Sequence, residues 1–207
     1  MDADDAVWSG SNLSSISLKG SSSGAATVGG TPTKGTVLNS LNSIRFDATS
    51  ERLSRTLAAW GTSGFIYVFA VCDKLYTGAS INGVLMGHDV IYGSGGMVLA
   101  LYDDASGAPY NGVSWYAEGS AWANGTGQAG EELFPSNNYL YGAPHLLAVQ
   151  LGTTNISRVD GSDVTPYRSR AVAVPNWSSR AWFFGNLGST NTSNAQADIY
   201  QLLILNY

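Results

Sequence analysis

Runs of apolar residues, broken by glycine and polar turn residues, recur along the chain from residue 44 onward. The longest run is Phe65–Cys72, which is bounded by Gly64 on one side and Asp73 on the other. β-Branched and aromatic side chains favour strands, whereas glycine and aspartate favour the turns between them. This run therefore predicts a strand in the interior of a sheet.

Shorter runs of the same kind follow, each separated from the next by Gly, Asp, Asn or Pro. The Asp160-Gly161 pair predicts a tight hairpin turn between strands around Ile156 and Val164. A short helix is expected around Ala48–Ala59, or a turn near Glu131–Phe134. The other expected strands lie around Ile44 and Phe46 and at Val84–Met86, Met97–Tyr102, Val113–Tyr116, His145–Leu151, Ala171–Val174, Ala181–Gly185 and Ile199–Leu205.

These strands, roughly ten to twelve in number, predict an all-β fold. The expected architecture is an antiparallel two-sheet jelly-roll sandwich over residues 44–207. Two facing sheets share one core, to which each strand contributes alternate side chains. The expected core residues are Phe65, Tyr67, Phe69, Leu99, Leu147, Val149, Phe183, Ile199 and Leu203.

Residues 1–43 are different, because single aliphatic residues are scattered among Ser, Gly, Thr and Asn. This composition is typical of a flexible arm. The alternative is a set of edge strands, indicated by Leu13, Ile16 and Leu18, that docks on the domain or on a neighbouring subunit. Both alternatives stay open on the sequence, and the chain is divided into an arm, 1–43, and a sandwich, 44–207.

Charged residues make up only 12% of the chain, against about 25% in an average soluble domain. A surface with so few charges favours association into homo-oligomers. The net charge of −5 excludes a broad nucleic-acid-binding surface. The absence of an 18-residue apolar run predicts no membrane insertion, and the acidic start Met-Asp-Ala-Asp-Asp predicts no secretory signal.

The order of motifs resembles a known family. Ala181–Gly188 places a strand ending in glycine before a polar loop, and the final strand Ala197–Asn206 reads acidic–Ile–x–x–aliphatic. With His145–Val149 and Ser43–Asp47, this order resembles the concanavalin A-like, laminin-G-like jelly-roll domains. Leu13–Leu18 is similar to the opening of the members found in bacteriophage tail and virion-surface proteins.

That resemblance implies a protein on the surface of a virion, assembled in the host cytoplasm and released by lysis. It further implies a homo-oligomer, with a homotrimer as the expected form, and other virion proteins as partners. The sequence departs from the family at Ala48, where glycine is usual.

No enzyme is expected. The single cysteine, Cys72, ends an apolar strand, where a thiol is usually an inert core residue. Glycoside hydrolysis needs two carboxylates facing each other across a cleft. The acidic pairs Asp103-Asp104 and Glu131-Glu132 fall in expected turns or loops instead, so no catalytic residue is assigned.

No cofactor is expected, although the resemblance to laminin-G modules raises calcium as a ligand. Calcium takes six to eight oxygen ligands, which loops rich in Asp and Asn supply. The candidate ligands are Asp103, Asp104 and Asp160, and no linear calcium-binding loop joins them.

The strongest binding feature is aromatic. Trp115, Tyr116 and Trp122 fall in a stretch rich in Gly and Asn that also holds Asn124, and Tyr139 follows in a similar setting. Exposed aromatic rings stack on the apolar faces of sugars, and amides bind the hydroxyl groups. The alternative is a tryptophan pair that packs at the edge of the sandwich or against a neighbouring subunit.

Two functions follow as hypotheses. The first is a non-enzymatic adhesin of a phage tail fibre or tail surface that binds a host glycan at these aromatic residues. The second is a decoration, or cement, protein of the capsid or tail with a purely structural role. The sequence does not separate the two.

Overall fold

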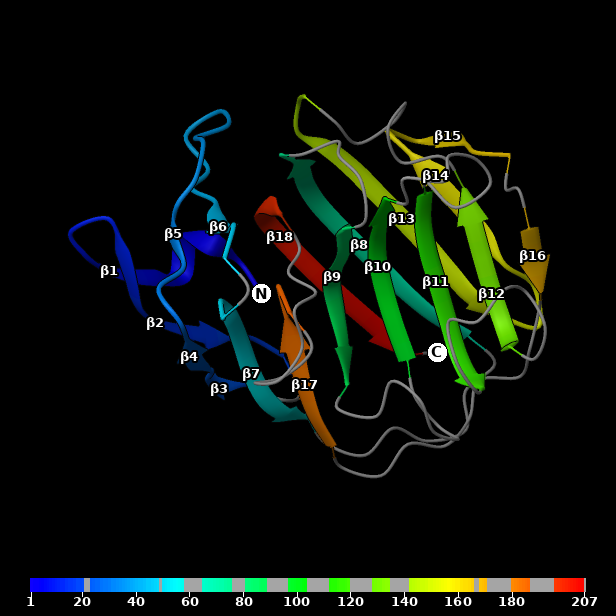
Figure 1. Cartoon of the computed structure of the whole chain (residues 1–207), viewed down its shortest axis with the longest axis horizontal. Coiled ribbons are helices and arrows are strands. Elements are labelled where there is room, and N and C mark those ends of the chain that lie inside the picture. Colours follow the sequence, from blue (N-terminus) through cyan, green and yellow to red (C-terminus); the bar gives the residue numbers. More distant parts are fainter. Residues whose placement is uncertain are drawn as a thin grey trace.

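A computed structural model describes residues 1–20, 23–48, 50–57, 65–75, 81–88, 97–103, 112–119, 128–134, 142–165, 168–170, 180–186 and 196–206. Within these residues the chain is almost entirely β-structure, apart from the short 3-10 helix η1 (Ala3–Asp5). All strand pairs are antiparallel, and they build two sheets (Figure 1). The described part of the chain holds no apolar helix of membrane-spanning length.

The first sheet has ten strands among the described residues, and its longest strands, β8 and β18, lie side by side in its middle. β3 (Gly24–Ala25) pairs with β2 beside the main path. In spatial order the others are β1 (Ala6–Ser9), β2 (Asn12–Leu18), β5 (Thr33–Lys34), β6 (Ile44–Phe46), β18 (Ala197–Asn206), β8 (Phe65–Lys74), β13 (His145–Gly152), β14 (Ile156–Val159) and β15 (Ser162–Asp163).

The second sheet has eight strands among the described residues and lies over the first in Figure 1. Its strands, in spatial order, are β16 (Arg168–Arg170), β12 (Gln128–Phe134), β11 (Gly112–Gly119), β10 (Met97–Asp103), β9 (Ile81–His88), β17 (Arg180–Phe184), β7 (Arg52–Leu57) and β4 (Thr27–Gly29). The core lies between the sheets, with Ile66 and Val68 from one and Leu85 and Leu99 from the other fully buried.

The expected fold is confirmed: the chain forms an antiparallel two-sheet jelly-roll sandwich of concanavalin A-like type. Each predicted strand overlaps or adjoins an observed one, except Ala171–Val174, which lies outside the described residues. Asp160 and Gly161 form the hairpin turn with φ values of 51° and 81°, a left-handed conformation that this residue pair favours.

The helix expected around Ala48–Ala59 is wrong, because β7 occupies Arg52–Leu57 and pairs with β17 and β4. Leu53 and Leu57 are both buried. Residues four apart share a face in a helix and in a strand, so this spacing does not distinguish the two.

The turn expected near Glu131–Phe134 is also wrong, because these residues belong to β12. Glu131 lies opposite Tyr116 of β11 and opposite Arg170 of β16. Backbone pairing with a strand on each side offsets the low strand propensity of two successive glutamates.

The core prediction placed the wrong face of β8 inside. Ile66, Val68, Ala70 and Cys72 are buried, whereas Phe65, Tyr67 and Phe69 face away from the core and are only half-buried. Side chains alternate between the two faces of a strand. In β8 both faces are apolar, so the pattern of hydrophobicity does not show which face is inner.

Two further core residues were misplaced for related reasons. The pairing of β18 with β8 shifts between Ile199 and Gln201, and this bulge turns Leu203 outward, where it is 52% exposed. Phe183 is half-buried, while its neighbours Trp182 and Phe184 are buried. The predicted core residues Leu99, Leu147, Val149 and Ile199 are buried as expected.

The first 43 residues contribute η1 and strands β1 to β5. The proposed boundary falls between β5 and β6, which pair with each other in the same sheet. The division of the chain into an arm and a sandwich stays a prediction.

A buried carboxylate ties this segment to the last strand. Asp198 of β18 is fully buried and accepts hydrogen bonds from Arg45 Nε (2.8 Å), Arg45 Nη2 (2.8 Å) and the Thr36 backbone nitrogen (2.9 Å). A Cβ atom at Gly35 would lie 2.2 Å from Asp198 Oδ1, so only glycine lets the backbone approach this closely. We call this arrangement the Asp198 clamp.

Candidate functional site

The sequence-predicted aromatic residues are only partly described. Trp115 and Tyr116 lie on β11, where Trp115 pairs with Leu99 of β10 and Tyr116 pairs with Val98. Successive strand positions belong to opposite faces, so these two positions do not share one face of the sheet. Trp122, Asn124 and Tyr139 lie outside the described residues. The glycan-binding role of all five stays a prediction.

Of the three candidate calcium ligands, the structure describes Asp103 and Asp160, which belong to different sheets. Asp103 ends β10 in the second sheet, Asp160 lies in the β14–β15 turn of the first sheet, and Asp104 is outside the described residues. Asp160 Oδ2 lies 2.7 Å from His145 Nδ1, and Oδ1 accepts from the Leu146 backbone nitrogen at 2.9 Å. The hydrogen bond to His145 lowers the pKa of Asp160. Among the described residues no three His, Cys, Asp or Glu side chains gather into a metal site.

Cys72 is a core residue. It is fully buried in β8, and burial raises the pKa of its thiol to about 12. The nucleophilic form of cysteine is the thiolate, which is absent at neutral pH when the pKa is this high.

Two carboxylate residues lie at paired positions of neighbouring strands in the first sheet. The sequence did not predict this pair. Asp73 of β8 pairs with Asp198 of β18. Burial and the charge of Asp198 raise the pKa of Asp73. A glycosidase pair needs both groups to reach a substrate. Asp198 is buried and held in the Asp198 clamp, so this pair is structural.

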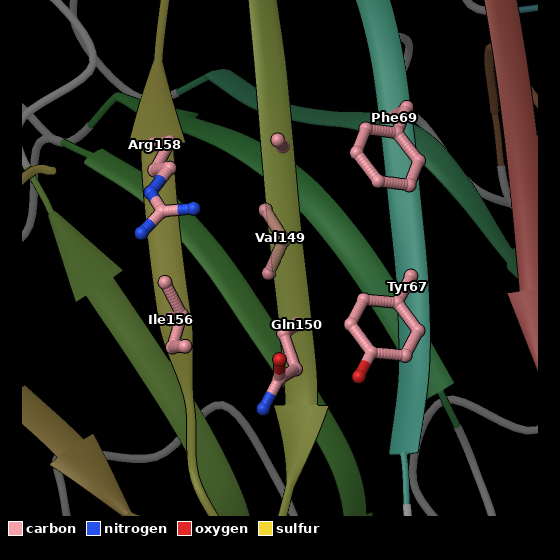
Figure 2. A pocket seen from close by; sticks show the side chains of 7 residues that line it. Tyr67, Phe69, Val149, Gln150, Ile156 and Arg158 are labelled. Atoms are coloured by element: carbon pink, nitrogen blue, oxygen red, sulfur yellow. The ribbon is translucent and has the colours of Figure 1, made fainter. Parts of the chain in front are cut away.

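The outer face of the first sheet carries a groove that the sequence analysis missed. It spans β8, β13 and β14, where the pairing aligns side chains in two rows (Figure 2). One row contains Phe69, Ala148 and Arg158, and the other contains Tyr67, Gln150 and Ile156. The small side chain of Ala148, between the larger side chains of its row, leaves the hollow open.

The polar groups of this groove are held in place. Gln150 Nε2 donates to the Thr154 carbonyl at 2.9 Å, and Arg158 Nε donates to Asp163 Oδ1 at 2.5 Å. Figure 2 shows the Tyr67 hydroxyl on the side of Gln150 and a terminal nitrogen of Arg158 directed toward β13. The groove therefore combines two aromatic rings with an amide, a phenol and a guanidinium.

The size of the groove limits what it holds. Its volume is about 140 Å³, well below the roughly 300–1,000 Å³ of pockets that enclose a drug-sized ligand. Such a hollow accepts one ring or one end of a larger molecule that remains mostly in solvent.

Two polar residues of this site could have been recognised from the sequence. Gln150 and Arg158 alternate with the buried residues Val149 and Val159, which marks the outer face of β13 and β14. The pairing of β13 with β8 then places Tyr67 and Phe69 on the same face. That pairing joins strands more than 70 positions apart, so strand periodicity alone does not predict it.

No family model matches the sequence, and no curated protein matches it. Solved structures do overlap the fold. Trypanosoma rangeli sialidase in complex with sialic acid matches with a TM-score of 0.52 and 12% identity, over 96% of this chain and 31% of the sialidase chain. Botulinum neurotoxin type C, which interacts with two ganglioside molecules, matches with a TM-score of 0.51 and 10% identity, over 94% and 47%.

The Ca²⁺/Man-bound exoplasmic/lumenal domain of VIP36 overlaps less well, with a TM-score of 0.48 and 11% identity over 84% of this chain and 81% of that one. This chain thus spans about a third of the sialidase and about half of the neurotoxin chain. At these identities the likeness shows the β-sandwich fold alone.

Proposed function

We propose that this protein is a non-enzymatic, lectin-like module that binds glycans in the groove of β8, β13 and β14. One observation carries the proposal: Tyr67 and Phe69 present their rings to solvent beside the amide of Gln150 and the guanidinium of Arg158. Aromatic rings contact the apolar C–H faces of a sugar, while amide, phenol and guanidinium groups bind its hydroxyls.

Two findings support binding without catalysis. The facing carboxylates, Asp73 and Asp198, lie outside the groove lining, and Asp198 is fully buried. The groove lining contains no acidic residue. A sugar bound there meets no general acid and no carboxylate nucleophile.

The test is a binding assay of the purified protein against a panel of neutral and acidic oligosaccharides. The double variant Tyr67→Ala/Phe69→Ala is expected to lose about tenfold or more in affinity, because each ring contributes on the order of 1 kcal/mol. Leu146→Ala is the matched control, since Leu146 is an exposed apolar residue of β13 that does not line the groove. Absence of any glycan binding by the wild-type protein would refute the proposal.

The aromatic residues expected from sequence provide a second pair of variants. If Trp115→Ala/Trp122→Ala abolishes binding and the Tyr67/Phe69 variant does not, the lectin function stands and the site moves to β11 and the segment after it. Loss of binding only in the groove variant assigns the site to the groove.

Where the protein acts is proposed from its resemblance to phage virion domains. We place it on the particle surface as a tail-fibre or tail-surface adhesin, with decoration of the capsid or tail as the alternative. Antibody labelling of intact particles distinguishes tail from capsid. Particles carrying the groove variant lose adsorption if the protein is an adhesin, and lose particle integrity if it is a decoration protein.

Self-association is part of the proposal. Leu203 and Leu205 of β18 are 52% and 38% exposed and lie opposite Phe69 and Tyr67. Exposed apolar patches on a soluble protein mark interaction sites. The patch contains no charge that would repel a second copy, and it lies on the side of β8 away from β13 and β14. The two leucines flank the groove without lining it, and several sites on one assembly raise the avidity for a cell surface.

A further inference from the structure

The groove lining contains one charged side chain, Arg158, and no carboxylate. Asp163 accepts from Arg158 Nε, and the pairing places Asp163 on β15, on the side of β14 away from β13. Asp163 is bound through Nε, and of the edge formed by the two terminal nitrogens, Figure 2 shows one nitrogen directed toward β13 and the groove.

That edge is suited to a carboxylate. A guanidinium presents parallel N–H groups that match the two oxygens of a carboxylate, and such charge-assisted pairs are stronger than hydrogen bonds between neutral groups. A site built only from neutral groups selects a sugar mainly through hydrogen bonds to its hydroxyl groups. Gln150 and Tyr67 supply such groups in the row of the groove that does not contain Arg158. Arg158 therefore adds selectivity for charge.

The spacing within the groove fits a ring with an attached acid group. Phe69 and Arg158 end one row, with only Ala148 between them, across strands about 5 Å apart. A ring over Phe69 and Tyr67 then places an exocyclic carboxylate over Ala148, within reach of the Arg158 terminal nitrogens. A neutral hydroxymethyl group in that position forms at most one uncharged hydrogen bond.

We infer that the ligand of the groove is an acidic sugar, with its carboxylate bound by Arg158. This inference rests on the proposed glycan-binding function and specifies its ligand class.

The experiment compares two probes that differ only in charge: an oligosaccharide ending in a uronic acid, and the methyl ester of the same oligosaccharide. Wild-type protein is expected to bind the acid about tenfold more tightly than the ester at low salt, and raised ionic strength should reduce that ratio. Arg158→Gln should bind both probes alike, with an affinity near that of the wild type for the ester.

Lys19→Gln is the control for net charge. Lys19 follows β2, six strands away from β14 in the sheet order, and its side chain is 71% exposed. This variant removes the same charge and should keep the preference for the acid. Arg158→Lys keeps the charge without the two-pronged geometry and should show a reduced preference.

Three outcomes separate the claims. Equal binding of the acid and the ester by wild-type protein overturns the inference and leaves the glycan-binding function in place. A preference for the acid that survives in Arg158→Gln also overturns the inference, because another group then binds the carboxylate. If wild-type protein binds neither these probes nor the wider panel, the proposed function itself fails.

Discussion

Two buried carboxylates of this fold differ in their partners. Asp198 is paired with Arg45 through two hydrogen bonds. Glu51 is also buried, and its Oε2 atom accepts from the backbone nitrogens of Asp47 and Ala48, at 2.7 and 2.9 Å. Asp198 has a cation as its partner, whereas Glu51 accepts from backbone nitrogens beside the like charge of Asp47. Substitution to the amide should therefore change the stability in opposite directions at the two positions.

Asp198→Asn should destabilise the protein by about 2 kcal/mol or more, because it leaves Arg45 without its partner. Asp163→Asn is the matched control, since Asp163 pairs with Arg158 at an exposed site where an ion pair contributes about 0–1 kcal/mol. Urea unfolding at pH 7 measures both variants. Equal losses in the two variants would show that the Asp198 clamp contributes no more than a surface pair.

Glu51→Gln should stabilise the protein at pH 7. Burial raises the pKa of Glu51, so the folded state favours the neutral carboxyl group and binds more protons than the unfolded chain between the ordinary and the raised pKa. The stability of the wild type attributable to this group therefore rises as pH falls through the raised pKa. Denaturant unfolding of both proteins from pH 7 down to pH 4 should show the advantage of the variant shrinking. A difference that does not change with pH would contradict this account.

At the level of elements, β8 shows what a strand sequence reveals and what it conceals. Its run of apolar residues predicted the strand, because few other structures accommodate such a run between turn residues. Which face is inner depends on the partner sheet, and Phe65, Tyr67 and Phe69 are as apolar as the residues they alternate with. The groove depends on that choice of face and on the pairing with β13, so the strand was predictable and the groove was not.

Local sequence was similarly ambiguous elsewhere. Leu53 and Leu57 fit a helix as well as β7, and the bulge at Tyr200 carries no proline or glycine to announce it. Aromatic residues close to glycine, such as Trp115 and Trp122, were the candidate site residues predicted from the sequence. Tyr67 and Phe69 do not meet this criterion, because they belong to the apolar strand β8.

The two faces of β8 should differ in their contribution to stability. Ile66→Ala is expected to lose about 3 kcal/mol, since it leaves a cavity between the sheets. Tyr67→Ala, on the neighbouring outward position, is expected to lose about 1 kcal/mol or less, from its cross-strand contacts. Equilibrium unfolding of both variants measures the difference, and a greater loss at Tyr67 would mean that the outer face is covered by another part of the assembly.

For the whole molecule, the low charge and the exposed leucines of β18 point to assembly from several copies. The double variant Leu203→Ser/Leu205→Ser should shift the protein toward monomers in light scattering, while the affinity for a monovalent glycan stays unchanged. Its binding to a surface coated densely with glycan should weaken, because avidity depends on linked sites. Val37→Ser is the control, because Val37 is an exposed residue of the N-terminal segment. If the wild-type protein is strictly monomeric at high concentration, the proposed homo-oligomer is refuted, and with it the expected trimer.

The position of β18 has a consequence for biosynthesis. This strand lies between β6 and β8, yet it follows every other described strand in the chain. During translation, β6 and β8 are therefore synthesised before the strand that pairs with both of them. Until β18 is present, the edges of β6 and β8 that face it have no partner strand. Unpaired strand edges are templates for aggregation, and contacts between distant residues slow folding. Translation that stops before residue 197 should yield an aggregation-prone product, and chaperones that bind exposed strands should engage this protein mainly in the interval before its last strand emerges.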